Sequence, residues 1–317
     1  MNEFERIHQL LAPLAAEHSI SFGLDDDVAM ISAGNMVITS DTIVRGVHYI
    51  GDEPAGLIAK KLLRCNLSDL AAKGATPKYY TLNMTLSEAE DDAWLAAFAQ
   101  GLGGDQEAYG IQLIGGDSTQ IKAGPCVLSV TAFGEIEEGA ALPLRANPQI
   151  GDVVCMSGTI GDAAIGLKLL QDTSLRVAED DIAYLIKRYQ LPVPRVALGQ
   201  ALLPYMHASM DISDGLIQDA EHIAKCSNVA MDLYADKLPL SPALQTLLSD
   251  KKITLQNIAA CGDDYEILCT MSEENAASFS AKLTVIGQVK KGSGVRLLDA
   301  SGNPITLPQK GYIHGTT

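Results

Sequence analysis

Short apolar runs rich in β-branched residues alternate with helical stretches along this chain, and that alternation restricts it to folds in which helices pack on sheets. In the first half, the pattern predicts helices at 56–72 and 93–108 and strands at 37–44, 111–114 and 126–133. In the second half, it predicts helices at 162–171, 196–203 and 214–225, a further helix ending near residue 190, and strands at 153–157, 208–212, 229–234, 265–270 and 285–289.

The alternation is interrupted at 139–152, where GAALPLRANPQIGD contains two prolines and two glycines and has little periodicity. Such a segment is typical of a connection between domains. The length of 317 residues also suits two domains of roughly 100 to 200 residues each. We therefore expect an α/β protein of mixed, α+β type, with domains at 1–138 and 139–317.

Charge and cysteine content limit the partners of the chain. Its 39 acidic and 23 basic residues give a formal net charge of −16, so we expect no binding to nucleic acid, which relies on clustered Lys and Arg. The six cysteines form no CxxC pair, which predicts reduced, mostly buried thiols. The N-terminal region is acidic and is followed by no apolar run of about 18 residues, so we expect a cytoplasmic protein without membrane contact.

Common catalytic templates are absent: the sequence contains no Walker A loop, GxGxxG, GxSxG or HExxH motif. It contains instead a set of aspartates on otherwise apolar helices or where predicted strands run out into turns. They are Asp25, Asp26, Asp27, Asp41, Asp69, Asp117, Asp211 and Asp214.

Several of these aspartates have a structural explanation when taken alone. Gly-Asp and Asp-Gly pairs are common in turns, Asp214 suits a helix N-cap, and Asp69 could pair with Lys73 one turn later. Together they indicate more, because strand ends are ligand-binding positions in open α/β sheets and neighbouring carboxylates repel unless a cation joins them. Oxygen ligands without clustered His or Cys suit Mg²⁺, Mn²⁺ or Ca²⁺. The set therefore predicts a nucleotide bound through several Mg²⁺ ions.

Seven motifs occur in a fixed order along nearly the whole chain: GLDDDVA, TSDTIVRGVHY, NLSDLAAKGATP, LIGGDST, MDISDGL, GDDYEIL and GYIH. Together they resemble the thiamine-monophosphate kinase family, in the superfamily of aminoimidazole ribonucleotide synthetase. The resemblance implies two α/β domains and a homodimer formed through the N-terminal sheet. It also implies ATP-dependent phosphorylation of thiamine monophosphate to thiamine diphosphate, with no nucleophilic side chain.

By matching position, the resemblance assigns residues to three tasks. It implies that the Mg²⁺ ligands are Asp26, Thr39, Ser40, Asp41, Asp69, Asp117, Asp211 and Asp214. It implies that the ATP contacts are Gly116, Asp117, Arg145 and Ser213. It implies that the substrate contacts are His48, Asp263 and Tyr312.

The chain departs from the family pattern at three places. Asp25 stands where the family usually has Gly, which leaves the register of the metal ligand open within residues 25–27. Cys261 and Asp263 replace Gly and Glu, and an aromatic residue is missing after His314.

Two other functions stay open from the sequence. Aminoimidazole ribonucleotide synthetase shares the general layout, although SDT, LSDLAAKGA and GYIH favour the kinase. A non-catalytic protein that binds cations or nucleotide would explain the acidity of the chain, but it gives no reason for Arg145 and Ser213 to accompany the aspartates.

Overall fold

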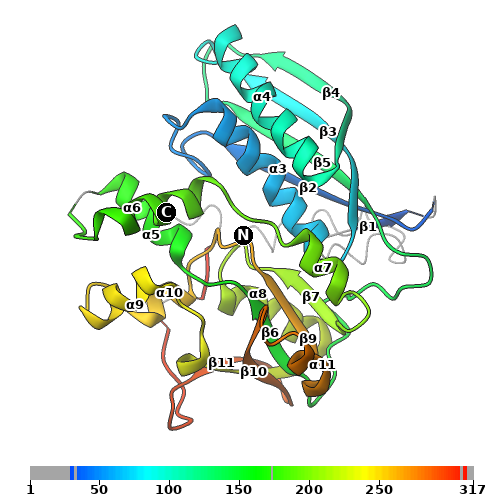
Figure 1. Cartoon of the computed structure of the whole chain (residues 1–317), viewed down its shortest axis with the longest axis vertical. Helices are drawn as coiled ribbons and strands as arrows, with labels where there is room; N and C mark the ends of the chain where they lie inside the picture. The colour runs from blue at the N-terminus through cyan, green and yellow to red at the C-terminus, as the bar shows by residue number, and fades with distance from the viewer. Residues whose placement is uncertain (1–28, 32–33, 173, 308–309, 313–317) are drawn as a thin grey trace.

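The computed structural model describes residues 29–31, 34–172, 174–307 and 310–312, and it contains two sheets (Figure 1). The first has the order β1-β2-β5-β3-β4, in which only β3 and β4 pair in parallel. Helices α3 (Ala55–Ala72) and α4 (Asp92–Tyr109) cover one face of this sheet. Its strands are β1 (Ala29–Ile31), β2 (Met36–Val44), β3 (Thr76–Leu86), β4 (Gln112–Gln120) and β5 (Val127–Glu135).

The second sheet has the order β11-β8-β10-β6-β9-β7, in which only β8 and β11 pair in parallel. Its strands are β6 (Val153–Ser157), β7 (Ala208–Asp211), β8 (Val229–Tyr234), β9 (Ile267–Met271), β10 (Leu283–Lys291) and β11 (Gly294–Leu298). The accompanying helices are α5 (Asp162–Gln171), α6 (Glu179–Gln190), α7 (Val196–Leu202), α8 (Leu216–Ser227), α9 (Pro242–Ser249), α10 (Leu255–Ala259) and α11 (Glu273–Ser278).

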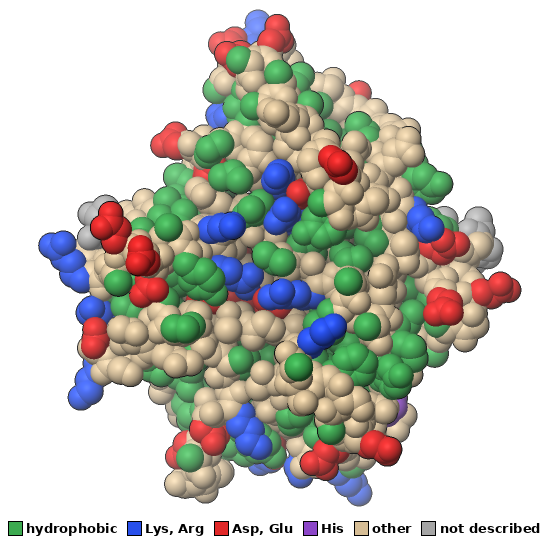
Figure 2. All heavy atoms as spheres, viewed as in Figure 1, with side chains coloured by type: hydrophobic (Ala, Val, Ile, Leu, Met, Phe, Trp, Pro, Cys, Tyr) green, Lys and Arg blue, Asp and Glu red, His purple; other side chains and the backbone are tan. Residues whose placement is uncertain are grey.

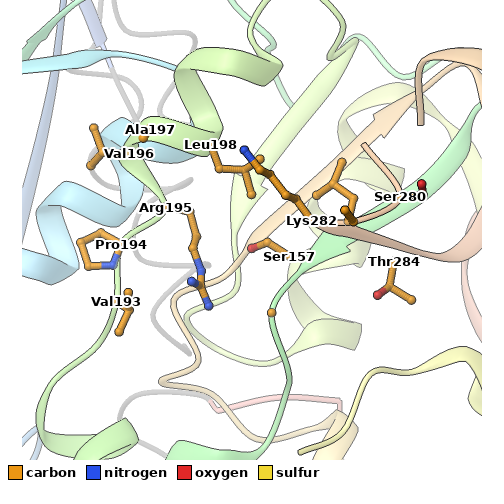
Figure 3. Close-up of a pocket in the computed structure, with 13 residues that line it drawn as sticks. Ser157, Val193, Pro194, Arg195, Val196, Ala197, Leu198, Ser280, Lys282 and Thr284 are labelled. Atoms are coloured by element: carbon orange, nitrogen blue, oxygen red, sulfur yellow. The ribbon is translucent and has the colours of Figure 1, made fainter. Parts of the chain in front are cut away.

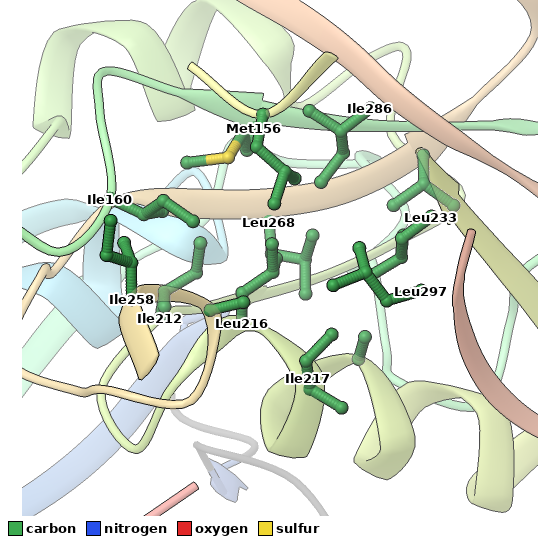
Figure 4. Close-up of a cluster of buried hydrophobic side chains, with 14 of the residues drawn as sticks. Met156, Ile160, Ile212, Leu216, Ile217, Leu233, Ile258, Leu268, Ile286 and Leu297 are labelled. Carbon is green, nitrogen blue, oxygen red and sulfur yellow. The ribbon is translucent and has the colours of Figure 1, made fainter. Parts of the chain in front are cut away.

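Each sheet has its own hydrophobic core. In the C-terminal half, Leu216 and Ile217 of α8 belong to one buried cluster with Leu268 of β9 and Leu297 of β11 (Figure 4). The N-terminal cluster joins α3 and α4 to the covered face of the first sheet. Burial of these side chains is the main favourable contribution to folding. A third cluster, which includes Cys155 of β6 and Cys269 of β9, covers the other face of the second sheet, whereas the face of the first sheet opposite α3 and α4 has no such cluster among the described residues.

The structure confirms the mixed α/β class, and β6, β8 and α5 have the predicted bounds. The sequence pattern misses β3, in which Pro77 and Lys78 interrupt the apolar alternation, and also β11. The predicted strand 111–114 extends through Gln120, so placing Asp117 at a strand end was wrong. A Cβ on Gly116 would lie 1.8 Å from the Leu82 carbonyl oxygen, so this glycine permits close strand approach instead of a turn.

Helix α3 also contacts the C-terminal half. Fully buried Lys73 follows the helix, and its Nζ donates to the carbonyl oxygens of Pro143 at 3.2 Å and Ser209 at 2.7 Å. The Ser209 hydroxyl donates in return to the Ala72 carbonyl. These hydrogen bonds satisfy a buried ammonium group and hold α3 against β7.

The contact between α3 and α7 depends on Gly199, because a Cβ there would lie 1.8 Å from the Ala71 carbonyl oxygen. We expect Gly199→Ala to lower the free energy of unfolding by about 1–3 kcal/mol through overpacking. Gly103→Ala in α4 is the matched control, since nothing lies within 4 Å of the added methyl group. Urea unfolding of both variants tests this, and equal stabilities would contradict it.

Candidate active site

Carboxylates from the two sheets meet where α3 faces β7. Asp41 lies on β2, Asp69 on α3 and Asp211 at the end of β7, with Asp214 in the following turn. The negative charges of Asp211 and Asp214 act on Asp41, and those of Asp211 and Asp41 act on Asp69. The structure therefore brings together four of the aspartates that the sequence predicted as ligands. We call these four residues the acidic cluster.

Strand alternation aims the N-terminal members of the acidic cluster. Thr39 and Asp41 are two residues apart on β2, so both side chains face α3. The Thr39 hydroxyl donates to Asp69 Oδ2 at 2.5 Å, and the Asp41 amide donates to Asn66 Oδ1 at 3.1 Å. Asn66 itself donates to the Leu62 carbonyl at 3.0 Å, which fixes its amide on the helix. Asn66 was not among the residues predicted from the sequence.

The acidic cluster has unusual proton affinities. Burial, followed by the charges of Asp211 and Asp214, raises the pKa of Asp41 to about 7. Burial also raises the pKa of Asp69 well above its ordinary value, with contributions from Asp211 and Asp41. Burial raises the pKa of Asp211 as well, although Ser68, Arg145 and Lys73 oppose the shift. Ionising the whole acidic cluster is therefore unfavourable without a cation.

Asp219, which the sequence analysis missed, organises the turn after β7. Its Oδ2 accepts the amide hydrogens of Ser213 at 3.1 Å, Asp214 at 3.2 Å and Gly215 at 3.0 Å. Its Oδ1 is buried without a hydrogen-bond partner in the described residues, and its ligand atom lies within 4.8 Å of those of Asp214 and His222. One sequence signal could have identified Asp219: it is an acidic residue in the first turn of the helix that follows Gly215.

The donors present fit a hard divalent cation. The acidic cluster offers carboxylate oxygens, the Thr39 hydroxyl lies beside Asp69, and the buried Asp219 oxygen lies near Asp214. Oxygen donors of this kind suit Mg²⁺ or Mn²⁺, and the positive charge of a bound cation would lower the raised pKa values of these carboxyl groups.

The predicted nucleotide residues Arg145 and Ser213 lie beside the acidic cluster. The positive charge of Arg145 acts on both Asp211 and Asp219, and the Arg145 carbonyl accepts from Ser227 at 3.1 Å. The Ser213 carbonyl accepts the Asp263 amide hydrogen at 2.8 Å. This hydrogen bond links the turn after β7 to a predicted substrate residue.

The predicted substrate residues approach the site from three segments. His48 Nδ1 accepts the Val44 amide hydrogen at 3.1 Å, which orients the imidazole ring. Asp263 has a positive φ of 67° and its Oδ2 accepts from Lys61 at 3.0 Å. The Tyr312 amide donates to the Asp214 carbonyl at 2.9 Å, and this tyrosine is 49% exposed. Tyr312 is therefore anchored by its backbone beside the turn after β7.

Three predicted positions lie apart from the acidic cluster, and one lies outside the described residues. The Ser40 hydroxyl lies on the opposite face of β2, where it donates to the Val130 carbonyl at 2.9 Å. Gly116 and Asp117 lie on edge strand β4, which is separated from β2 by β5 and β3. At one strand spacing each, this places them roughly 14 Å from β2. Asp26 is the position outside the described residues.

A cavity of about 610 Å³ lies elsewhere, beside Ser157, Arg195 and Lys282 (Figure 3). Lys and Arg side chains gather across the middle of the face seen in Figure 2, despite the acidic composition. None of the residues predicted for metal, nucleotide or substrate lines this cavity. Arg195 serves a structural purpose there, because its Nε and Nη2 donate to fully buried Glu266 at 2.7 and 2.6 Å and thereby support the end of the Asp263 loop.

Comparison with known proteins identifies the family. Residues 25–136 match the family described as AIR synthase related protein, N-terminal domain. The thiamine-monophosphate kinase of Caulobacter vibrioides is 37% identical over 99% of this chain and 91% of its own length. That of Escherichia coli K12 is 37% identical over 94% of this chain and 93% of its own length.

The chain belongs to the thiamine-monophosphate kinase family. Solved structures agree: one described as AaThiL complexed with AMPPCP and TMP has a TM-score of 0.87 at 29% identity, covering 99% of this chain and 97% of its own. Thiamine-monophosphate kinase from Stenotrophomonas maltophilia has a TM-score of 0.77 at 38% identity, covering 96% and 98%. The resemblance inferred from the seven motifs is thus confirmed. Among the described residues, none of the helices combines the length and the apolar character that a membrane span requires.

The raised pKa values of this kinase-family site predict how its stability depends on pH. The folded pKa of Asp41, about 7, exceeds its ordinary value of 3.8, so its contribution to stability is full below 3.8 and lost as pH rises through 7. Without divalent metal, we expect the melting temperature to fall between pH 6 and pH 8, and Mg²⁺ to reduce this fall. Calorimetry in EDTA and in Mg²⁺ tests this prediction. In EDTA, the melting temperature of Asp41→Asn should fall less steeply with pH than that of the wild type. Equal slopes in both buffers would contradict it.

Proposed function

We propose that this chain transfers the γ-phosphoryl group of ATP directly to thiamine monophosphate, giving thiamine diphosphate and ADP. The observation that carries the proposal is the acidic cluster, which draws carboxylates from both halves of the chain to one place. Full-length similarity to thiamine-monophosphate kinases supports the reaction, and the related structure with AMPPCP and TMP supports the two ligands. Phosphoryl transfer needs positioning and charge neutralisation more than covalent chemistry.

We propose that this site binds several Mg²⁺ ions. The residues that would hold them are Thr39 and the acidic cluster, with Asp26 as the further ligand expected from the sequence. When bound, Mg²⁺ neutralises phosphate charge in such reactions.

The chain's own residues supply the nucleotide site. Asp219 holds three consecutive amides, so the turn that carries Ser213 and Asp214 is fixed before ligand arrives. Arg145 adds a cation beside Asp211, where a guanidinium fork suits phosphate oxygens. These groups bind and orient ATP, and none of them needs to act as a nucleophile.

We assign three residues to contacts with thiamine monophosphate, namely His48, Asp263 and Tyr312. The thiazolium ring is cationic, and both the Asp263 carboxylate and the face of the exposed Tyr312 ring attract a cation. His48 accepts the Val44 amide hydrogen at Nδ1, which orients its ring, and we propose that the ring contacts the substrate. Together they would orient thiamine monophosphate with its phosphate toward the metal ligands.

A homodimer would explain why Ser40, Gly116 and Asp117 lie apart from the acidic cluster, although the family pattern assigns them to the metal and ATP site. Asp117 pairs with Asn83 of β3, while Asp41 shares a row across the sheet with Val130 and Leu82. Asp117 therefore faces away from Asp41 within one chain. A second copy packed on this free face would place its β4 near Ser40. All nine residues of β4 are exposed, as such an interface requires.

We assign residues 1–138 to dimerisation and part of the ATP and metal site, and residues 139–317 to completing the nucleotide and substrate site. A cytoplasmic location suits the six cysteines, all of which are free thiols.

Asp69→Asn tests the proposed metal role directly. We expect kcat/KM for thiamine diphosphate formation to fall at least about 100-fold, because a ligand carboxylate is lost. We also expect the metal-free melting temperature to stay equal or rise, since repulsion within the acidic cluster decreases. Product is measured chromatographically with ATP, Mg²⁺ and thiamine monophosphate. The control is Asp92→Asn at an exposed position of α4, which should behave like wild type. Near-normal turnover would remove Asp69 from the ligand set.

Subunit complementation tests the shared site. Asp69→Asn and Asp117→Asn proteins should each be inactive alone, but subunit exchange should restore up to about a quarter of the wild-type rate, because half of the dimers then hold one intact site. Mass photometry and a thiamine diphosphate assay before and after exchange provide the measurement. A mixture that stays inactive although exchange occurs would place Asp117 in the site of its own chain.

A further inference from the structure

Lys61 is a buried cation at the contact between α3 and the C-terminal half, with 3% of its side chain exposed. Its Nζ donates to the His48 carbonyl oxygen at 2.9 Å and to Asp263 Oδ2 at 3.0 Å. The same ammonium group lies 3.7 Å from the centroid of the Tyr189 ring. Lys61 therefore joins two residues that we assign to the substrate and that are more than 200 positions apart in the sequence.

Further hydrogen bonds close this arrangement. The Tyr189 hydroxyl donates to the same His48 carbonyl at 3.1 Å, and the Tyr265 hydroxyl donates to Asp263 Oδ1 at 3.1 Å. Both carboxylate oxygens of Asp263 thus have a partner, and the His48 backbone is held from α3 and from α6. The four segments that meet here are the loop after β2, α3, the end of α6 and the loop before β9.

The contacts of Lys61 leave it no role in direct substrate binding. An ammonium group has three N–H donors; two point to oxygen atoms, and the Tyr189 ring covers a third direction. Burial opposes its charge, yet Asp263 and Tyr189 raise the pKa of Lys61 above its ordinary value, so it stays protonated. Lys61 therefore neither contacts the substrate nor transfers a proton.

The Asp263 loop needs such support because its backbone conformation is unfavourable. Asp263 and Tyr265 have positive φ angles of 67° and 52°, which non-glycine residues rarely adopt. Their amides donate to the carbonyl oxygens of Ser213 and Ile212, both at 2.8 Å. These hydrogen bonds fix the loop backbone, whereas Lys61 and the Tyr265 hydroxyl fix the Asp263 carboxylate.

We propose that Lys61 is a positioning residue for thiamine monophosphate, which sets the spacing between His48 and Asp263 and thereby the affinity for this substrate. The inference rests on the proposed function, because it takes His48 and Asp263 as substrate contacts. Lys61 acts on substrate binding and leaves ATP binding and phosphoryl transfer to the residues around the acidic cluster.

Steady-state kinetics of Lys61→Met, which keeps the apolar stem and removes the charge, tests the proposal. The KM for thiamine monophosphate should rise at least about tenfold, while the KM for ATP and kcat change less than about threefold. Lys61→Arg, which retains a cation for Asp263, should recover part of the loss. The control is Lys60→Met, since Lys60 is its neighbour on α3 and its Nζ lies 4.0 Å from Asp105. Lys60→Met should behave like wild type.

A double-mutant cycle separates positioning from general damage. If Lys61 acts through Asp263, Lys61→Met in an Asp263→Asn background should raise the KM much less than it does alone. Equal changes in both KM values and kcat, or independent effects of the two substitutions, would overturn the proposal. If Lys61→Met does not fold, Tyr265→Phe removes the other Asp263 contact and should raise the same KM, and an unchanged KM there would overturn it. A wild-type protein that forms no thiamine diphosphate would instead disprove the proposed function.

Discussion

Repulsion among carboxylates from two sheets is the constraint on which the rest of this structure depends. Asp41, Asp69 and Asp211 lie close enough that their charges act on each other, and burial of each disfavours ionisation further. A fold does not gather such groups for its own stability, because separating them would relieve the repulsion. The arrangement is explained by a function that supplies positive charge with the ligand, and Mg²⁺ with a nucleotide is the ligand that oxygen donors and the family both favour.

Helix α3 makes this gathering possible. Thirteen of its 18 residues are buried, and it has no side-chain cap at its N-terminus, so packing on both sides stabilises it more than its own termini do. One side packs into the N-terminal core. The other presents Asn66 and Asp69 to the site, and Lys73 follows at the end of the helix. Asn66 and Asp69 thus hydrogen-bond β2, whereas Lys61 and Lys73 join the helix to the C-terminal half.

Much of this site could be predicted from local sequence, and the rest depends on tertiary geometry. Asp69 stood out because a carboxylate in the apolar helix needs a partner, and the structure supplies Thr39. Asp117 looked equivalent in sequence, yet pairing of β4 with β3 places it on the other face and at the edge of the sheet. Lys61 gave no signal, because its partner Asp263 is distant in sequence and a lysine on a helix usually faces solvent. The residue types of the site were therefore predictable from the sequence, but the face of the sheet on which a residue lies and its partner from a distant segment were not.

The two buried lysines of this region also limit how the halves of the chain can move. Lys61 and Lys73 are separated by 12 positions, or about 18 Å along a helix, and each holds a different part of the C-terminal half. Asn66 and Asp69 lie between them. With α3 held at two points, rotation of one half against the other would break hydrogen bonds of at least one buried ammonium group, which is strongly unfavourable. The acidic cluster is therefore preorganised, as expected for a reaction whose catalysis depends on positioning.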